Sequence, residues 1–156
     1  MPTLIPGDRL VADIRHPDVL PTYGDMAIFR NPHDPGVDYI KRVVGLPGDL
    51  VQLRQGVLYL NGRPIKRVTV ESKHYRETLP NGRTYDVLGS DDAPEENTGE
   101  FKVPPDSFFV LGDNRDNSLD SRQLKNFGYV PAANVIGIAH TVFWTHDMSR
   151  LFSRIE

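Results

Sequence analysis

The chain contains no cysteine among its 156 residues. Disulfide bonds, thiolate metal sites and a cysteine nucleophile are therefore excluded. The chain also lacks any apolar run close to the roughly 18 residues that a membrane-spanning helix needs, and no secretory signal peptide is recognisable. We therefore expect the chain as given to be soluble.

An excess of basic residues is also missing, since 18 Lys and Arg stand against 21 Asp and Glu, for a formal net charge of −3. A nucleic-acid-binding domain normally carries a basic excess or stripe, so we expect no nucleic-acid partner. A local cationic site stays compatible with this balance. Apolar residues make up 38% of the chain, which permits one packed domain with a small insertion.

Cofactor-binding patterns are absent as well. There is no phosphate-binding glycine loop, and the five histidines show no metal-ligand spacing. Asp116, Ser118 and Asp120 imitate the first ligands of a calcium loop, but Ser121 and Phe127 stand where Gly and a bidentate Glu are required. We expect no metal and no other cofactor.

No serine lies in a Gly-x-Ser-x-Gly elbow. A histidine triad stays open, because its members need not be close in sequence.

Turn residues are plentiful, with 13 Gly and 13 Pro scattered through the chain. Short β-rich runs between them predict a mostly β fold. We expect antiparallel β-sheets that form a partly open, barrel-like core with a small β-hairpin insertion. The predicted strands are Arg9–Ile14, Met26–Arg30, Tyr39–Val44, Leu50–Arg54, Val57–Leu60, Tyr75–Leu79, Thr84–Leu88, Phe108–Leu111 and Val135–Trp144.

Two Asn-Gly pairs indicate hairpins: Asn61-Gly62 stands between the strand Val57–Leu60 and Arg63-Pro64-Ile65, and Asn81-Gly82 lies between the runs 75–79 and 83–87. Residues 66–100 are more polar than their surroundings, and we interpret them as a small lobe on a β core of residues 1–65 and 101–147. The acidic run at 90–97 is typical of a solvated loop. Residues 148–156 are expected to form a C-terminal tail, either a short helix or a frayed end.

Two neighbouring cations, Lys41 and Arg42, lie in the apolar run Tyr39–Val44. Side chains alternate along a strand, so the two cations face opposite sides, and both sides are otherwise apolar. Burial can lower a lysine pKa by up to ~3–5 units, and a neutral amine is a competent general base, whereas arginine stays protonated. Lys41 is therefore a candidate base and Arg42 a candidate structural cation. The alternative is that both side chains reach past an edge to water.

A second polar segment, Gly112–Arg122, follows the apolar run Phe108–Leu111. It contains three acids and two arginines within eleven residues, and such a loop can brace itself with carboxylate–guanidinium pairs. The alternative is a solvent-exposed loop with several turns.

Together these segments resemble bacterial type I signal peptidases. Tyr39–Asp49 resembles the lysine-bearing box of that family, and Gly112–Arg122 resembles its last signature box nearly letter for letter. Further fits are Gly24–Phe29, Phe127–Pro131 and Ile136–Gly137, so that the resemblance runs from Met1 to about Trp144.

The resemblance implies a serine endopeptidase with a serine–lysine pair. In the family, a serine hydroxyl attacks the carbonyl at the cleavage site of a secreted preprotein, and a neutral lysine takes its proton. Lys41 matches this base, and Ser118 matches a serine that orients the lysine amine. The pairs Arg42–Asp113 and Asp120–Arg122 match residues that brace the active site.

The resemblance also implies where the substrate binds. Leu4, Leu10, Tyr39 and Ile40 match positions that line pockets for small residues, so Ala-x-Ala-like cleavage sites are expected. The peptide would bind extended, beside the Lys41 strand. The full-length enzyme would work at a membrane surface, with its catalytic domain on the extracytoplasmic side.

The nucleophile itself is expected outside the given residues. The family's nucleophile box reads Ser-Met-x-Pro-Thr-Leu, and Pro2, Thr3 and Leu4 match its end. The serine would therefore lie two residues before Met1, together with an edge strand and membrane spans. The alternative is a non-catalytic, peptide-binding relative. A self-cleaving repressor-type protease is disfavoured by the 112–122 box and by the lack of recognisable DNA-binding helices.

Overall fold

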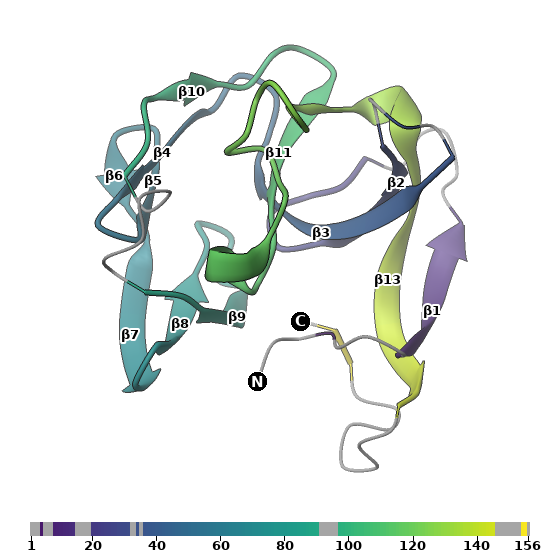
Figure 1. Cartoon of the computed structure of the whole chain (residues 1–156), viewed down its shortest axis with the longest axis horizontal. Helices are drawn as coiled ribbons and strands as arrows, with labels where there is room; N and C mark the ends of the chain where they lie inside the picture. The colour runs from purple at the N-terminus through teal and green to yellow at the C-terminus, as the bar shows by residue number, and fades with distance from the viewer. Residues whose placement is uncertain are drawn as a thin grey trace.

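Three antiparallel β-sheets make up the described part of the protein in the computed structural model (Figure 1). The structure describes residues 4, 8–14, 20–31, 34, 36–90, 97–145 and 154–155. The strand orders are β1-β13-β2-β3-β11-β12, β10-β4-β5-β6 and β7-β8-β9. None of the three sheets is closed, and the expected mostly β, antiparallel architecture is confirmed.

The strands agree closely with the sequence-based expectation. Their bounds are β1 Arg9–Ile14, β2 Met26–Arg30, β3 Asp38–Gly45, β4 Leu50–Arg54, β5 Val57–Leu60, β6 Arg63–Pro64, β7 Lys66–Glu71, β8 His74–Thr78, β9 Thr84–Leu88, β10 Phe101–Lys102, β11 Ser107–Leu111, β12 Val130–Pro131 and β13 Val135–Trp144. Two three-residue 3₁₀ turns, η2 (Arg115–Asn117) and η3 (Ala132–Asn134), are the helical elements of the described part.

Four short or exposed strands were not predicted, and each lacks a usable pattern. β6, β10 and β12 have only two residues each, which is too short for an alternation of burial. β7 is an edge strand with no fully buried residue, and its two alternating valines, Val68 and Val70, are too few to mark a strand among four polar neighbours. Residues 66–100 contain the expected hairpin, formed by β8 and β9, and β7 adds a third strand to it; this three-stranded sheet is the lobe sheet.

Both predicted hairpins are confirmed. β5 and β6 pair across Asn61-Gly62, where both residues have positive φ, as a tight hairpin turn requires. β8 and β9 pair across the turn that contains Gly82, whose φ is +84°. Gln55-Gly56 makes a further turn with positive φ at both positions, between β4 and β5.

Two hydrophobic clusters fill the interior, and β3 and β11 contribute to both. Val44 on β3 belongs to the first cluster, which lies against the four-stranded sheet and the lobe sheet. Val43, one residue earlier, belongs to the second cluster, within the six-stranded sheet. β11 divides in the same way, with Phe109 in the first cluster and Phe108 and Val110 in the second. Because successive side chains of a strand point to opposite faces, β3 and β11 each contribute to both clusters and so connect them.

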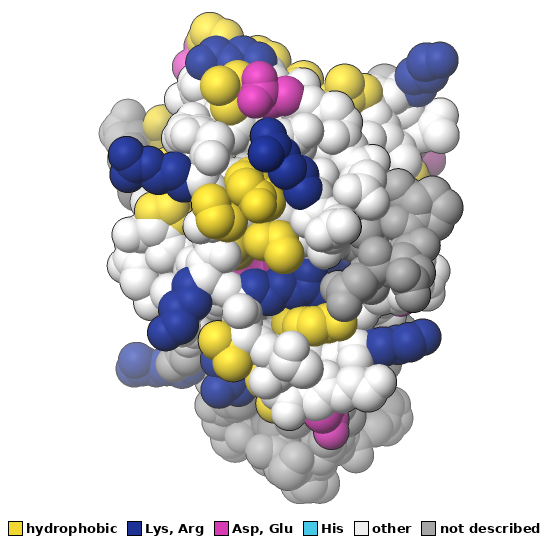
Figure 2. Space-filling view, turned by 90° about the vertical axis from the view of Figure 1, so that its left-hand side faces the viewer, with side chains coloured by type: hydrophobic (Ala, Val, Ile, Leu, Met, Phe, Trp, Pro, Cys, Tyr) yellow, Lys and Arg dark blue, Asp and Glu magenta, His cyan; other side chains and the backbone are white. Residues whose placement is uncertain are grey.

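The side of the molecule formed by β4 to β7 carries several Lys and Arg side chains around a group of hydrophobic ones (Figure 2). Two arginines of these strands stack on tyrosines: the Arg54 guanidinium on β4 lies 4.7 Å from the Tyr59 ring centroid, and that of Arg67 on β7 lies 3.6 Å from the Tyr75 centroid. A local cationic surface therefore exists despite the negative net charge.

Several expectations fall outside the described residues. The acidic run is described only at positions 90 and 97, and the predicted tail only at 154 and 155. Arg154 bridges Thr141 of β13 in an antiparallel β-bridge. No helix in the described part is long and apolar enough to span a membrane. The division into a core and a lobe stays a prediction.

Candidate active site

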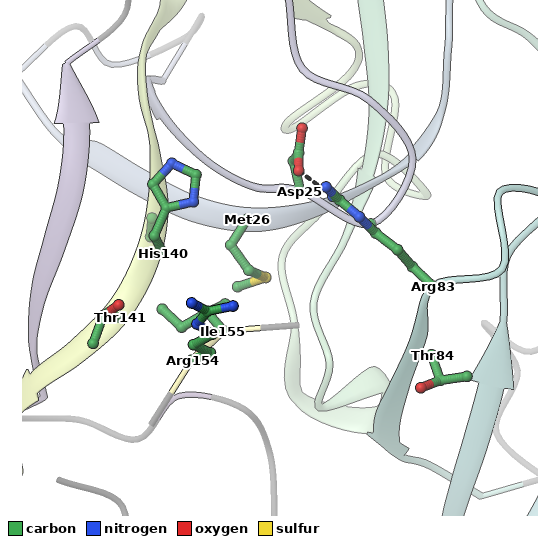
Figure 3. Close-up of a pocket in the computed structure, with 10 residues that line it drawn as sticks. Asp25, Met26, Arg83, Thr84, His140, Thr141, Arg154 and Ile155 are labelled. Carbon is green, nitrogen blue, oxygen red and sulfur yellow. Dashed lines mark hydrogen bonds and ion pairs between the residues drawn. The ribbon is translucent and has the colours of Figure 1, made fainter. Parts of the chain in front are cut away.

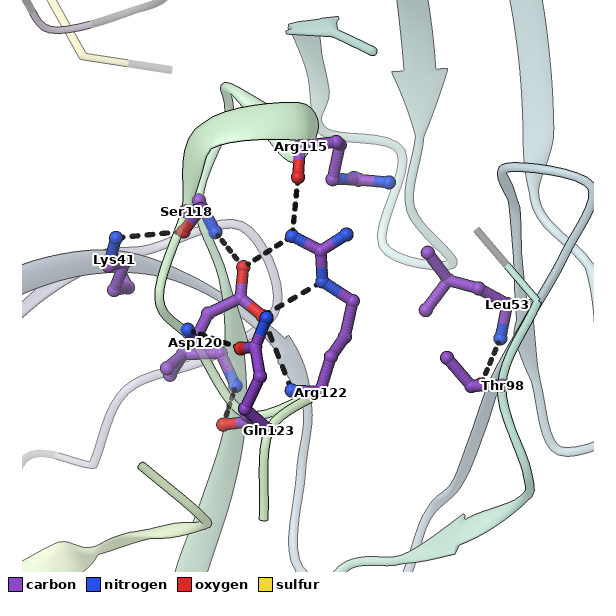
Figure 4. A network of polar contacts seen from close by, with 11 residues as sticks. Lys41, Leu53, Thr98, Arg115, Ser118, Asp120, Arg122 and Gln123 are labelled. Carbon is purple, nitrogen blue, oxygen red and sulfur yellow. Dashed lines mark hydrogen bonds and ion pairs between the residues drawn. The ribbon is translucent and has the colours of Figure 1, made fainter. Parts of the chain in front are cut away.

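Lys41 lies in the middle of β3, where the strand passes between β2 and the loop that follows β11. Its Nζ donates a hydrogen bond of 2.8 Å to Ser118 Oγ, across 77 residues of sequence (Figure 4). The structure therefore brings together the two residues that the family resemblance had paired. The side chain of Lys41 is half-buried.

The pKa of Lys41 is lowered from its ordinary value, first of all because burial disfavours the ammonium ion. Among the neighbouring charges, Asp120 and Asp113 oppose this effect and Arg122 reinforces it. An amine with a lowered pKa has a larger neutral fraction near neutral pH, and only the neutral form can accept a proton.

Arg42 is fully buried, and its guanidinium is completely engaged. Nε and Nη2 donate to the two carboxylate oxygens of Asp113 at 2.8 and 2.9 Å, and Nη1 donates to the Gly24 carbonyl at 2.8 Å. Tyr85 covers the cation with its ring centroid 4.3 Å away. Burial acts to lower the pKa of Arg42, but the attraction of Asp113 outweighs it and raises the pKa. The expected Arg42–Asp113 pair is present and fixes the start of the 112–122 loop against β3.

A second buried ion pair holds the end of this loop (Figure 4). Arg122 Nε and Nη2 donate to Asp120 at 2.9 and 3.0 Å, and Asp120 also accepts a 3.1 Å bond from the Gly112 amide. Ser121 closes the base of the loop, because its Oγ accepts from the Val110 amide at 3.0 Å and its own amide donates to the Val110 carbonyl. Both ends of the segment are therefore buried and braced, whereas Asp116, Asn117 and Leu119 in its middle are exposed.

Gly112 gives Ser118 the room to reach Lys41. A Cβ added at Gly112 would lie 2.1 Å from Ser118 Oγ and 2.5 Å from Ser118 Cβ, with Lys41 Nζ at 3.4 Å. Contacts below 3.0 Å are not tolerated without movement. Any larger residue at position 112 would therefore push Ser118 away from the amine.

The predicted substrate-contacting residues lie on two strands and one isolated position. Tyr39 and Ile40 are half-buried on β3, next to Lys41, whereas Leu10 lies on β1, with β13 and β2 between the two strands. Leu4 is half-buried, and its immediate neighbours in the chain lie outside the described residues. Two of these four residues, Tyr39 and Ile40, thus lie on the same strand as Lys41.

A comparison with protein families agrees with this geometry. A profile of the family described as "Signal peptidase, peptidase S26" matches residues 1–144. The chain belongs to the signal peptidase family. The braced lysine–serine pair is therefore found within a signal peptidase domain.

Curated relatives of this chain include signal peptidases from Rickettsia. Signal peptidase I of Rickettsia typhi is 42% identical over 143 residues, which cover 80% of this chain and 53% of the relative. Signal peptidase I of Rickettsia canadensis is 44% identical over 142 residues, covering 80% and 52%. The chain spans about half the length of the curated relatives it matches.

A solved structure is also similar. The crystal structure of a signal peptidase I from Enterococcus faecalis shares 29% sequence identity with this chain and gives a TM-score of 0.51. The match covers 81% of this chain and 98% of that chain.

Sequence reasoning missed three residues of this signal peptidase domain that adjoin the site. Glu77 on β8 is fully buried and pairs with Arg115 of the 112–122 loop, from Oε2 to Nη2 at 2.5 Å. Tyr85 on β9 donates its hydroxyl to Glu77 at 2.7 Å. The available signal was Glu77 itself, an acid that alternates with Tyr75 and Leu79 on a predicted apolar strand face.

A cavity of about 580 Å³ lies elsewhere in the domain, lined in part by Met26, Thr84, His140 and Thr141 (Figure 3). At one side of it Arg83 forms an ion pair with Asp25. Lys41, Ser118 and the residues of the two bracing ion pairs are not among the residues that line it. The cavity is therefore separate from the candidate active site.

Proposed function

We propose that this domain is the catalytic part of a type I signal peptidase, a serine endopeptidase that removes signal peptides from secreted preproteins. Lys41 acts as the general base and Ser118 orients its amine. The observation that carries the proposal is the 2.8 Å contact from Lys41 Nζ to Ser118 Oγ, in surroundings that lower the pKa of Lys41. Arg42–Asp113 and Asp120–Arg122 hold the strand and the loop that carry the pair.

The proposed nucleophile is a serine two residues before Met1 in the longer protein, as the match of Pro2, Thr3 and Leu4 to the family's nucleophile box supports. Its hydroxyl oxygen attacks the scissile carbonyl carbon while its proton passes to the neutral Lys41 Nζ. The protonated amine then gives that proton to the departing amine of the peptide. Water, deprotonated by Lys41, hydrolyses the acyl-enzyme and restores the serine.

The proposed peptide site is the edge of β3 beside Lys41. β2 pairs with β3 over Asp38–Arg42, whereas β11 pairs on the other side only from Arg42 to Gly45. Within the described residues, no strand is paired to that other side at positions 38–41. An extended peptide can add to an unpaired strand edge, and Tyr39 and Ile40 would contact its side chains. We propose that this site prefers small residues in an Ala-x-Ala-like pattern. The full-length enzyme is proposed to work at a membrane surface, on the extracytoplasmic side.

The test uses the chain extended by the residues encoded upstream, up to and including the proposed serine. Cleavage of a peptide with an Ala-x-Ala site is measured as kcat/KM against pH. We expect kcat/KM to rise with pH along a limb that reports the pKa of Lys41 in the free enzyme, because a protonated amine cannot accept a proton. Burial places this limb below the pKa of a free lysine.

Two substitutions make the assignment specific. Lys41→Ala removes the base, and Lys41→Arg keeps a cation that stays protonated, so both are expected to abolish cleavage. Lys66→Ala, an exposed lysine on β7, is the matched control and should cleave normally. Substantial turnover by Lys41→Arg would refute the role of Lys41. Binding of signal-sequence peptides by the extended chain without any cleavage would favour the non-catalytic alternative.

A further inference from the structure

Glu77 and Tyr85 form a buried polar group in the lobe sheet that the proposed mechanism does not use. Glu77 accepts the Tyr85 hydroxyl at 2.7 Å and two donors of Arg115, at 2.5 Å from Nη2 and 3.2 Å from Nη1. The side chain of Glu77 is 0% exposed and that of Arg115 is 2% exposed. A carboxylate without water is stable only when its charge and its lone pairs are satisfied. Glu77 meets both conditions through Tyr85 of the same sheet and Arg115 of the 112–122 loop.

Arg115 connects this buried group to the candidate active site. Its backbone carbonyl accepts a 2.6 Å bond from Arg122 Nη2, and Arg122 is the partner of Asp120 (Figure 4). Ser118 lies in the chain between Arg115 and Asp120, directly after the η2 turn. Ser118 is therefore flanked in the chain by Arg115 and Asp120, and both of these residues are hydrogen-bonded to Arg122.

The lobe sheet also contacts the start of the same loop. The Tyr85 ring covers the Arg42 guanidinium, which pairs with Asp113. The Leu88 amide at the end of β9 donates to the Asp113 carbonyl at 2.8 Å, and Leu88 bridges Asn114. The first half of the loop that carries Ser118, from Asp113 to Arg115, thus rests on β8 and β9.

We propose that Glu77 and Tyr85 are positioning residues, which act through Arg115 to hold Ser118 against Lys41. This inference rests on the proposed function, because it concerns the same lysine. It makes the lobe sheet part of the active-site architecture rather than a separate insertion. A purely structural role would lower stability without changing the surroundings of the Lys41 amine.

The direction of change in the Lys41 pKa separates these roles. The groups that face Lys41 are the acids Asp113 and Asp120, the cation Arg122, the hydroxyl of Ser118 and the Tyr39 ring, 6.0 Å away. If the loop loosens, water reaches Nζ, the burial effect weakens and the pKa rises. If losing the Glu77 charge acted only through space, a distant negative charge would be removed and the pKa would fall. The two effects have opposite signs.

The experiment is an NMR titration of the chain as given, with ¹³C-labelled lysine, and it does not require a nucleophile. The chain has five lysines, and Lys41→Arg identifies the Lys41 signal. Glu77→Gln keeps the shape of residue 77 and removes its charge. Glu71→Gln, the same change at a 74% exposed residue of the lobe sheet, is the matched control.

We expect Glu77→Gln to raise the Lys41 pKa by about one pH unit, with the other lysines and the Glu71→Gln variant unchanged. A folded Glu77→Gln chain whose Lys41 pKa is unchanged or lower would overturn the inference. If Glu77→Gln does not fold, Tyr85→Phe takes its place, because it keeps both charges and removes only the hydroxyl. It should raise the Lys41 pKa by a smaller amount, and no change would overturn the inference. An ordinary Lys41 pKa in the parent chain would contradict the proposed function instead.

Discussion

At the scale of single residues, the two cations of β3 differ in what surrounds their charges. Arg42 points into the first hydrophobic cluster and is neutralised there by Asp113. Lys41 points to the other face and contacts a hydroxyl, which can orient an amine without neutralising it. A buried cation with a carboxylate partner stays charged, whereas burial beside a hydroxyl favours the neutral amine. The two neighbours are therefore suited to opposite tasks, one structural and one chemical.

Gly112 offers a test of the lysine–serine contact that leaves both residues in place. In the extended chain, Gly112→Ala should displace Ser118, since the new Cβ would lie 2.1 Å from its Oγ. Because a shift of about 1 Å near a reacting group can cost ~100-fold in rate, we expect kcat/KM to fall about 100-fold. Gly99→Ala, where an added Cβ meets nothing within 4 Å, is the control. Normal cleavage by Gly112→Ala would show that the close contact is not needed.

At the scale of elements, β3 and the 112–122 loop are joined by the Arg42–Asp113 pair across 71 residues. Such a pair is strongly coupled, because removing one partner leaves a buried charge without compensation, whereas removing both does not. The Arg76–Asp86 pair on β8 and β9 is a contrast, since Arg76 is 54% exposed. Arg76 lowers the pKa of Asp86 through a hydrogen bond, but solvent screens exposed pairs.

Urea denaturation should separate these two pairs. Asp113→Leu is expected to lower the free energy of unfolding by about 3–5 kcal/mol. The double variant Arg42→Met/Asp113→Leu should be more stable than that single variant, because no unpaired charge remains. Arg76→Ala should leave the urea midpoint close to that of the parent protein, because solvent screens this pair. A double variant less stable than Asp113→Leu would contradict the argument that charge compensation dominates at this site.

At the scale of the whole molecule, the two hydrophobic clusters share β3 and β11 and cannot separate without breaking these strands. The lobe sheet contributes Leu79, Tyr85 and Val87 to the first cluster, so it packs as part of the same interior. We therefore expect the domain to unfold in one cooperative step.

Truncations in each cluster test this cooperativity. Leu58→Ala in the first cluster and Phe127→Ala in the second should lower the free energy of unfolding by about 2–5 and 3–5 kcal/mol. The fluorescence of the single tryptophan, Trp144 on β13, and far-UV circular dichroism should still report one transition. Val68→Ala, an exposed residue of β7, should change stability by less than about 0.5 kcal/mol. Separate transitions by the two probes in Leu58→Ala would show that the clusters unfold independently.

The fold was largely predictable because its strands carry local signals. β1, β2, β4, β5, β9 and β13 were predicted with the bounds that the structure gives, since each is bounded by turn residues. β7 was not predicted, because its apolar face consists of only Val68 and Val70, among polar neighbours that suit a loop equally well. Lys41 and Ser118 were identified through motifs of the signal peptidase family, and their contact agrees with that resemblance. Their catalytic roles stay a prediction.

The sequence by itself determined the turns, most strands and the family, because these depend on residues that are close together in the chain. Only the tertiary structure decided that Arg42 is fully buried and that Glu77 pairs with Arg115, 38 residues away in the loop that carries Ser118. Ion pairs between distant segments follow no spacing rule. Their partners are selected by which strands become neighbours, and burial then requires each charge to find a compensating group.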